Sequence, residues 1–345
     1  ARDIARWLVN AHNPLVFVER SGRDPAAVAE LVRLSELLAL PIAENAGADR
    51  MNFPHTHAHF GTGPRSRDAD VLLMLDVVAP FIPGRESPPA NAKIAWIGAD
   101  PVQSRYKTME YRADIWSPAN VALTLRAIHA EAEKLLDKSA LDRIAGRREK
   151  LATRKREIDA DLEQQAAEAA KQSRPNGCYV AHELGRLLSP DAVLLNDAIS
   201  NADFVRAYAH RQTSGSYFRS GGSSGGWGSG AAFGAKLTAP DRDVVLASGD
   251  GYFMFGTPMA ALWAANYHKA PYLSVVFVNG SYSTGTTGLK RMYPQGVAVG
   301  SDNYSGGIFD PPPDFAKLAE ANGGYGRMVT ETADVAPALE EGLRQ

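Results

Sequence analysis

Short apolar runs separated by stretches with helical spacing recur along the first 136 residues of the chain. Continuous apolar runs of this kind are typical of parallel strands that are buried on both faces. The pattern predicts strands at 15–18, 71–75, 93–97 and 114–116, and helices at 4–10, 26–40 and 121–136. Strands that alternate with helices indicate a parallel sheet with helices on both faces.

The same alternation returns after position 176. Here the pattern predicts strands at 192–195, 244–247, 272–278 and 326–330, and helices at 179–188, 314–321 and 333–343. A further helix is expected from Pro258, because proline is well tolerated at the first helical position. The segment 281–310 is rich in Gly, Ser and Tyr, so we expect a long loop without regular structure there, of the functional or mobile kind.

Between these halves, positions 131–173 are densely charged and favour a helix. A narrow apolar stripe runs along this helix. Its members are Leu141, Ile144, Leu151, Ile158 and Leu162. The run is short for a partner-binding coiled coil, which remains an alternative. We therefore predict an α/β protein with two doubly wound parallel-sheet domains, at 1–135 and 176–345, joined by a charged connector helix at 136–175.

Composition agrees with this organisation, because 345 residues are enough for about two domains. The net charge of −2 gives no reason to expect binding to nucleic acid or to an anionic membrane. No apolar run approaches the roughly 18 residues of a membrane-spanning helix. The single cysteine, Cys178, excludes an internal disulfide, favours a reducing cytoplasm and is expected to be a small, partly buried hydrophobic residue.

Candidate chemistry lies where two neighbouring predicted strands end. Gly249-Asp250-Gly251 follows one strand, and Asn279 ends the next. A right-handed strand-helix-strand unit brings both ends to one edge of the sheet, so Asp250 and Asn279 are expected to be neighbours. A carboxylate and an amide oxygen suit a hard cation such as Mg²⁺, which is often shared with phosphates, and the glycines allow a close backbone approach.

Each element of this pattern has a purely structural alternative. Asp-Gly turns are common, and Asn279 before Gly280 can be a turn former. His55, His57 and His59 would share one face of an extended strand and invite a metal interpretation. No carboxylate or cysteine is spaced with them as a second ligand set, so we favour polar loop histidines.

Two further polar segments precede these strands. Asn196 to Ser200 follow a predicted strand and precede a helix, an arrangement that can cradle an anion. In the glycine-rich segment, Gly226-x-Gly228-x-x-Ala231 matches a dinucleotide fingerprint. That fingerprint requires a buried strand directly before it, and the preceding residues Ser214–Ser220 do not form such a pattern. The turn after the first predicted strand, Glu19 to Gly22, lacks such a fingerprint too, so we expect no nucleotide site there.

Taken together, these motifs resemble the thiamine diphosphate-dependent enzymes, in particular the benzoylformate decarboxylase and acetolactate synthase branches. The resemblance rests on GDG, the following helix with Ala-Leu-Trp, and the apolar strand that ends in Asn279. It extends to the glycine-rich segment YFRSGGSSGGWGSGAAFGA and to PPDFAKLAEANGG. Residues 1–135 are similar to the central domain of that family, and residues 176–345 to its diphosphate-binding domain.

The resemblance implies a cofactor, an ion and the residues that bind them. Asp250, Asn279 and the backbone carbonyl of Ser281 would hold Mg²⁺. The residues implied for thiamine diphosphate are Ser200, Gly225, Gly226, Trp227, Gly249, Asp250, Gly251, Tyr252, Asn279 and Ser281. Trp227 stands where the family usually has the Leu, Met or Ile that bends the cofactor, and Val278 replaces the first of two asparagines. The segment 281–310, with Tyr282 and Lys290, would cover the site.

The implied activity is decarboxylation or carboligation of a small-molecule 2-oxo acid. In this family an N-terminal domain supplies the glutamate that activates the cofactor, and each site forms between two subunits. We therefore expect this chain to be a fragment that is inactive alone, and the intact enzyme to be a homodimer or homotetramer. Two alternatives stay open: a catalytically silent cofactor-binding module, and a nicotinamide-dependent oxidoreductase that uses Gly226 to Ala231.

Overall fold

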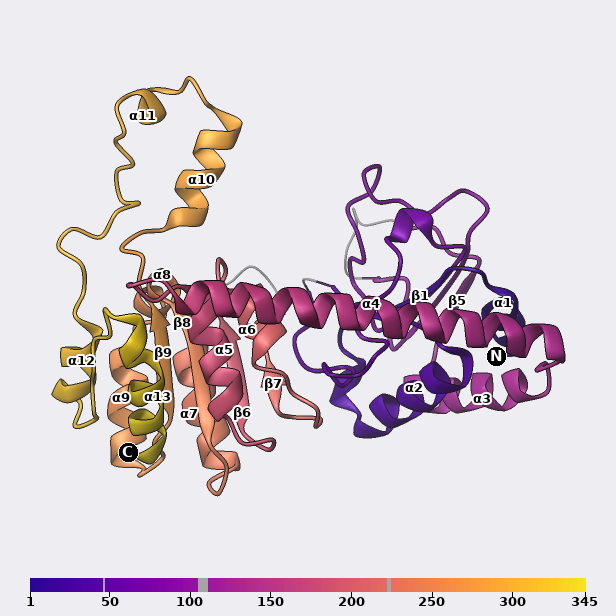
Figure 1. Cartoon of the computed structure of the whole chain (residues 1–345), viewed down its shortest axis with the longest axis horizontal. Coiled ribbons are helices and arrows are strands. Elements are labelled where there is room, and N and C mark those ends of the chain that lie inside the picture. Colours follow the sequence, from indigo (N-terminus) through magenta and orange to yellow (C-terminus); the bar gives the residue numbers. More distant parts are fainter. Residues whose placement is uncertain (46, 105–110, 222–224) are drawn as a thin grey trace. The chain divides into compact units, whose positions relative to one another are not determined.

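The computed structural model describes residues 1–45, 47–104, 111–221 and 225–345. The chain forms two compact units (Figure 1). The first comprises Ala1–Asp161 and Arg211–Ser216, and the second comprises Leu162–His210 and Tyr217–Gln345. Helix α4 (Lys138–Ala170) begins in the first unit and ends in the second. Within the described residues, no helix has the length and apolar character needed to span a bilayer.

The first unit is built on a five-stranded parallel sheet with the order β2-β1-β3-β4-β5. Its strands are β1 (Pro14–Val18), β2 (Ile42–Glu44), β3 (Val71–Leu75), β4 (Lys93–Gly98) and β5 (Ile115–Pro118). Its helices, besides α4, are α1 (Arg2–Asn10), α2 (Pro25–Leu38) and α3 (Val121–Glu133). Strands β1 and β3 are buried along their whole length, as their continuous apolar runs predict.

Helix α4 packs on this unit through much of the predicted stripe, because Ile144 and Leu151 are buried as expected and only Leu141 departs. Ala140, Ile144, Arg147 and Leu151 are buried, whereas Leu141 is 51 % exposed. Arg147 takes part because its guanidinium donates hydrogen bonds to the carbonyls of Ala39, Ala11 and Leu38, at 2.9, 2.8 and 2.5 Å. These carbonyls lie just after α1 and at the end of α2, so the arginine closes two helix ends.

The second unit has a four-stranded parallel sheet with the order β7-β6-β8-β9. Its strands are β6 (Val193–Asp197), β7 (Tyr217–Phe218), β8 (Val244–Gly249) and β9 (Leu273–Phe277). Its helices include α5 (Gly177–Leu187), α6 (Ala202–Tyr208), α7 (Gly228–Thr238), α8 (Asp250–Phe255), α9 (Pro258–Tyr267), α12 (Phe315–Ala321) and α13 (Val335–Arg344). The predicted α/β class with two parallel sheets is confirmed.

Two local predictions for this unit are wrong. The segment 281–310 contains helices α10 (Ser283–Met292) and α11 (Val297–Gly300), which Figure 1 shows away from the sheet. Lys290 and Arg291 lie in the last turn of α10, where cations favour the helix dipole, and this signal was hidden by the Gly, Ser and Thr content. Residues 326–330 form no strand. Gly326 is instead packed on α12, where a β-carbon would lie 2.1 Å from the Ala316 carbonyl oxygen.

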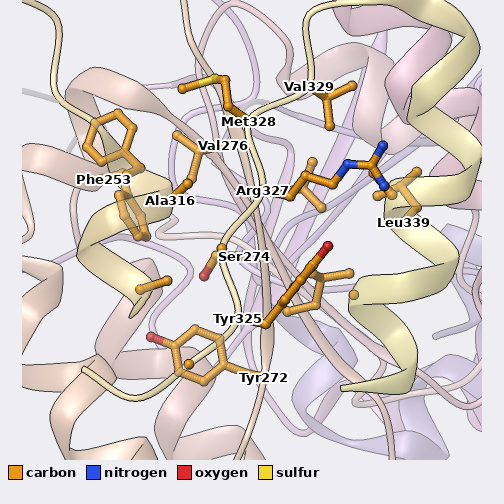
Figure 2. Close-up of a pocket in the computed structure, with 18 of the residues that line it drawn as sticks. Phe253, Tyr272, Ser274, Val276, Ala316, Tyr325, Arg327, Met328, Val329 and Leu339 are labelled. Carbon is orange, nitrogen blue, oxygen red and sulfur yellow. The ribbon is translucent and has the colours of Figure 1, made fainter. Parts of the chain in front are cut away.

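Strand β9 therefore forms one edge of its sheet, beside a cavity of about 1530 Å³. Figure 2 shows side chains of β9, such as Ser274 and Val276, together with Met328 and Val329 of the extended segment and Leu339 of α13. The side chains of residues 273–276 are half-buried, whereas those of 244–248 in β8 are buried. Strand β9 is thus paired with β8 along one edge, and its other edge faces the cavity.

Candidate functional site

The candidate site lies at the carboxyl edge of the second sheet. Strand β8 ends at Gly249, and Asp250 begins helix α8 directly, so the expected Gly-Asp-Gly turn is in fact the first turn of a helix. The Asp250 side chain is 2 % exposed. Its Oδ1 accepts the backbone N–H of Gly251 at 2.8 Å, and its Oδ2 accepts those of Asn279 at 2.9 Å and Gly280 at 2.7 Å. One buried carboxylate thus ties the end of β8 to the chain that leaves β9.

Asn279 and Ser281 form the second part of this network. The Asn279 Oδ1 accepts hydrogen bonds from the backbone N–H of Ser281 at 2.9 Å and from its hydroxyl at 3.0 Å. Antiparallel hydrogen bonds fix the same segment from outside, because Tyr282 N–H donates to Gly307 and Phe309 N–H donates to Gly280. The structure therefore brings Asp250, Asn279 and Ser281 together, whereas Ser200 lies on an exposed turn after β6.

Aromatic rings cover the glycines of the site. A β-carbon on Gly251 would lie 2.7 Å from the Tyr282 ring, which packs edge-on against Phe309 with centroids 4.8 Å apart. A β-carbon on Gly225 would lie 2.1 Å from the ring of Tyr252. These positions need glycine because the ring of a neighbouring tyrosine occupies the space of a side chain. Gly222, Ser223 and Ser224 of the glycine-rich segment lie outside the described residues.

Asp197, which ends strand β6, is a buried acid that sequence reasoning left without a role. Its side chain is 3 % exposed, and its Oδ2 accepts the backbone N–H groups of Gly226 at 3.0 Å and Gly228 at 3.1 Å. Burial raises the pKa of Asp197 to about 6, against the lowering effect of these two hydrogen bonds. An acidic residue at a strand's carboxyl end was the available signal, but its partners lie about thirty positions further along the chain.

The glycine-rich segment does not have the context of a dinucleotide-binding loop. Trp227 precedes the first residue of α7, and the strand before it, β7, has two residues and ends at Phe218. A dinucleotide fingerprint needs a strand that leads directly into the glycines. This arrangement argues against the nicotinamide alternative for Gly226 to Ala231.

The clustered histidines His55, His57 and His59 have separate partners. The Nδ1 of His59 lies 2.8 Å from the Ser35 hydroxyl, the Nε2 of His57 lies 3.6 Å from Glu36, and the Nε2 of His55 lies 3.5 Å from Glu44. Burial lowers the pKa of His59 to about 4, with the neighbouring His57 contributing next. Across the described residues, no group of three or more His, Cys, Asp or Glu side chains could hold a metal ion.

The donor set at the sheet edge is of another kind. It combines the Asp250 carboxylate with the amide oxygen of Asn279, which one hydrogen-bonded network brings together, and the expected third ligand is the carbonyl of Ser281, whose N–H donates to Asn279. A few hard oxygen donors suit Mg²⁺, because this ion usually fills its other coordination positions with water and with phosphate oxygens of a ligand. The residues present therefore fit a magnesium ion that is shared with a diphosphate.

Comparison with known proteins finds a family match in the second half of the chain. Residues 199–345 match the family described as thiamine pyrophosphate enzyme, C-terminal TPP binding domain. Benzoylformate decarboxylase from Pseudomonas aeruginosa is 25 % identical over 94 % of this chain and 57 % of its own length. Sulfoacetaldehyde acetyltransferase from Castellaniella defragrans is 26 % identical over 98 % of this chain and 59 % of its own length. The chain thus spans less than two thirds of these relatives.

Solved structures show the same fold. A thiamine diphosphate-dependent 4-hydroxybenzoylformate decarboxylase from Rhodococcus jostii superposes on 99 % of this chain with a TM-score of 0.75 and 20 % sequence identity. The match covers 61 % of that protein. Benzoylformate decarboxylase from Polynucleobacter necessarius gives a TM-score of 0.74 at 18 % identity. Both units of the chain therefore have the fold of these enzymes.

Proposed function

Because this chain is related to the thiamine pyrophosphate enzymes, and its residues 199–345 match their cofactor-binding domain, we propose that it is part of a thiamine diphosphate- and Mg²⁺-dependent decarboxylase or carboligase. The proposed substrate is a small-molecule 2-oxo acid. The observation that carries the proposal is the network of Asp250, Asn279 and Ser281, which brings a carboxylate and an amide oxygen together at one sheet edge, next to Ser281.

In this proposal, each residue of the site has a physical task. Asp250, Asn279 and the Ser281 carbonyl would hold Mg²⁺. The residues that would contact the diphosphate are Gly249, Gly251, Tyr252 and Ser200, and those that would contact the thiazolium are Gly225, Gly226 and Trp227. When bound, thiamine diphosphate supplies the nucleophilic carbon and the electron sink for the decarboxylation. The protein holds the ion, orients the diphosphate and excludes water.

A thermal-shift titration with thiamine diphosphate and Mg²⁺ tests this function. A ligand that binds only the folded state adds about 2.7 kcal/mol of stability at 100 times its Kd. We expect a shift that needs both ligands, that disappears in Asp250→Ala, and that persists in Asp241→Ala, which changes an exposed acid on a turn. Absence of any shift in the chain and in the longer natural protein would refute the proposal. A shift without turnover in that longer protein would favour the silent binding module.

We also propose that the intact protein is at least a dimer. Exposed apolar side chains recur every four residues from the end of α8 along α9 and form a row. Such a row is larger than the single exposed apolar residues that are common on protein surfaces. The row consists of Phe255, Met259, Trp263 and Tyr267. Sedimentation of the intact protein tests this: Trp263→Lys should shift the mass toward the monomer, and Leu123→Lys, at an exposed position in the first unit, should not.

A further inference from the structure

We propose that Asp197 is the positioning residue of the glycine-rich loop, and that its carboxylate determines where the Trp227 indole lies at the candidate cofactor site. This inference rests on the proposed function for the identity of the ligand. The contact between Asp197 and the loop itself does not depend on that function.

A single oxygen of the Asp197 carboxylate holds the loop. The Oδ2 of Asp197 accepts the N–H groups of Gly226 at 3.0 Å and Gly228 at 3.1 Å, which are the two neighbours of Trp227 in the chain. Hydrogen bonds donated to a charged acceptor are about twice as strong as those between neutral groups. The backbone on both sides of Trp227 is therefore held to the end of β6, in the middle of the sheet.

Steric contacts limit the loop to this position. A β-carbon on Gly228 would lie 2.8 Å from the Asp197 β-carbon, so only glycine permits the approach. On the other side, Gly226 has a φ of 89° and its backbone packs on Gly256. A β-carbon on Gly256 would lie 2.2 Å from the Gly226 carbonyl oxygen. The loop is thus held between β6 and the end of α8, and the Trp227 side chain projects from a fixed backbone.

The second oxygen of the Asp197 carboxylate remains available to accept a hydrogen bond. The Oδ1 of Asp197 is buried and has no hydrogen-bond partner among the described residues, and the same holds for Nε1 of Trp227. The indole is nevertheless near enough to favour the charged form of the carboxyl group. Buried polar atoms are rarely left unsatisfied without a functional reason. The Asp197 carboxylate thus acts on Trp227 through the backbone on both sides of it and through the indole itself.

The charge of Asp197 is coupled to the neighbouring α8. Tyr252 is a titratable group on that helix; burial and then the Asp197 charge raise its pKa, and the Arg219 charge lowers it. A proton on Asp197 weakens the acceptor that holds Gly226 and Gly228. The position of the Trp227 indole is then expected to change near the pKa of Asp197, about 6.

Intrinsic fluorescence of the free chain tests this without any ligand. We expect tryptophan emission to change with a midpoint near pH 6, and this change to be absent in Asp197→Asn and in Trp227→Phe. Asp203→Asn, at an exposed acid on α6, is the matched control and should retain it. An unchanged titration in Asp197→Asn would overturn the proposal, because the signal would then come from another group.

Cofactor binding gives the second readout. Asp197→Ala should weaken the apparent affinity for thiamine diphosphate with Mg²⁺ at least tenfold, whereas Asp197→Asn, which keeps an acceptor for the two N–H groups, should stay within about threefold at pH 7.5. Near-native affinity in a folded Asp197→Ala variant would overturn the positioning role. If the wild-type chain binds no cofactor, the proposed function fails at that point, and the fluorescence titration still decides the role of Asp197.

Discussion

The Asp250 carboxylate accepts the backbone N–H of Asn279 at 2.9 Å, so a buried side chain at the end of one strand fixes the backbone at the end of the next. The same oxygen accepts the N–H of Gly280 at 2.7 Å. These hydrogen bonds link two of the proposed ion ligands, Asp250 and Asn279, as part of the fold. The stability of the second unit and the integrity of its site are therefore expected to depend on the same residue.

Replacing Asp250 with alanine should lower the free energy of unfolding by about 2 to 4 kcal/mol, because the backbone N–H groups of Gly251, Asn279 and Gly280 lose their acceptor. Asp250→Asn keeps one acceptor oxygen and should cost less than Asp250→Ala. Urea unfolding monitored by circular dichroism measures both, with Asp241→Ala as the exposed control. Equal stability of wild type and Asp250→Ala would contradict the proposed tie between the strands.

Replacing Gly225 with alanine should destabilise the second unit by about 1 to 3 kcal/mol, because its β-carbon would overlap the ring of Tyr252. Removing the ring in Tyr252→Ala should restore space for the methyl group. The double variant is then expected to be more stable than the sum of the two single effects predicts. Gly230→Ala, where no atom lies within 4 Å of the added β-carbon, is the matched control.

Arg147 should matter far more to the first unit than its neighbour Arg148. Arg147→Met leaves three carbonyls without their donor and should cost about 3 kcal/mol of the free energy of unfolding. Arg148 is exposed and donates to the single carbonyl of Glu36, so Arg148→Met should cost less than about 1 kcal/mol. Chemical denaturation of the two variants side by side would decide between them.

His59 should make the first unit sensitive to acid. Its folded pKa of about 4 lies below its ordinary value of 6.5, so the folded state favours the neutral ring. The contribution of the neutral ring is fully present above pH 6.5 and is lost as the pH falls toward 4. The difference in unfolding free energy between wild type and His59→Asn should therefore shrink over that window. A difference that stays constant from pH 7 to pH 4 would show that the ring is not held neutral.

Most strands could be predicted because their apolar runs are continuous. The run at 71–75 matches β3 (Val71–Leu75) in full, since burial on both faces leaves no polar position that could blur the boundary. The approach of Asp250 to Asn279 also followed from topology, because parallel strands bring their carboxyl ends to one edge.

What could not be predicted depends on contacts between distant segments. The strand expected at 326–330 has the right composition, yet a strand requires a partner, and Gly326 is committed to α12. The role of Asp197 was equally hidden, because its partners Gly226 and Gly228 lie on a loop that only the folded sheet brings near. Leu141 belonged to the apolar stripe by spacing, but the buried face of α4 follows Arg147 instead.

The open edge of β9 affects how fast the backbone amides next to the site exchange with solvent. Amide protons of β8 are shielded by ladders on both sides and should exchange with solvent only when the whole sheet opens. Those of β9 that point toward the cavity have no ladder partner within the described part of the chain, and should exchange through local fluctuations. Asp250 follows the strand that should exchange slowly, and Asn279 follows the strand whose cavity-facing amides should exchange faster. The proposed ion ligands are thus drawn from one rigid and one yielding segment.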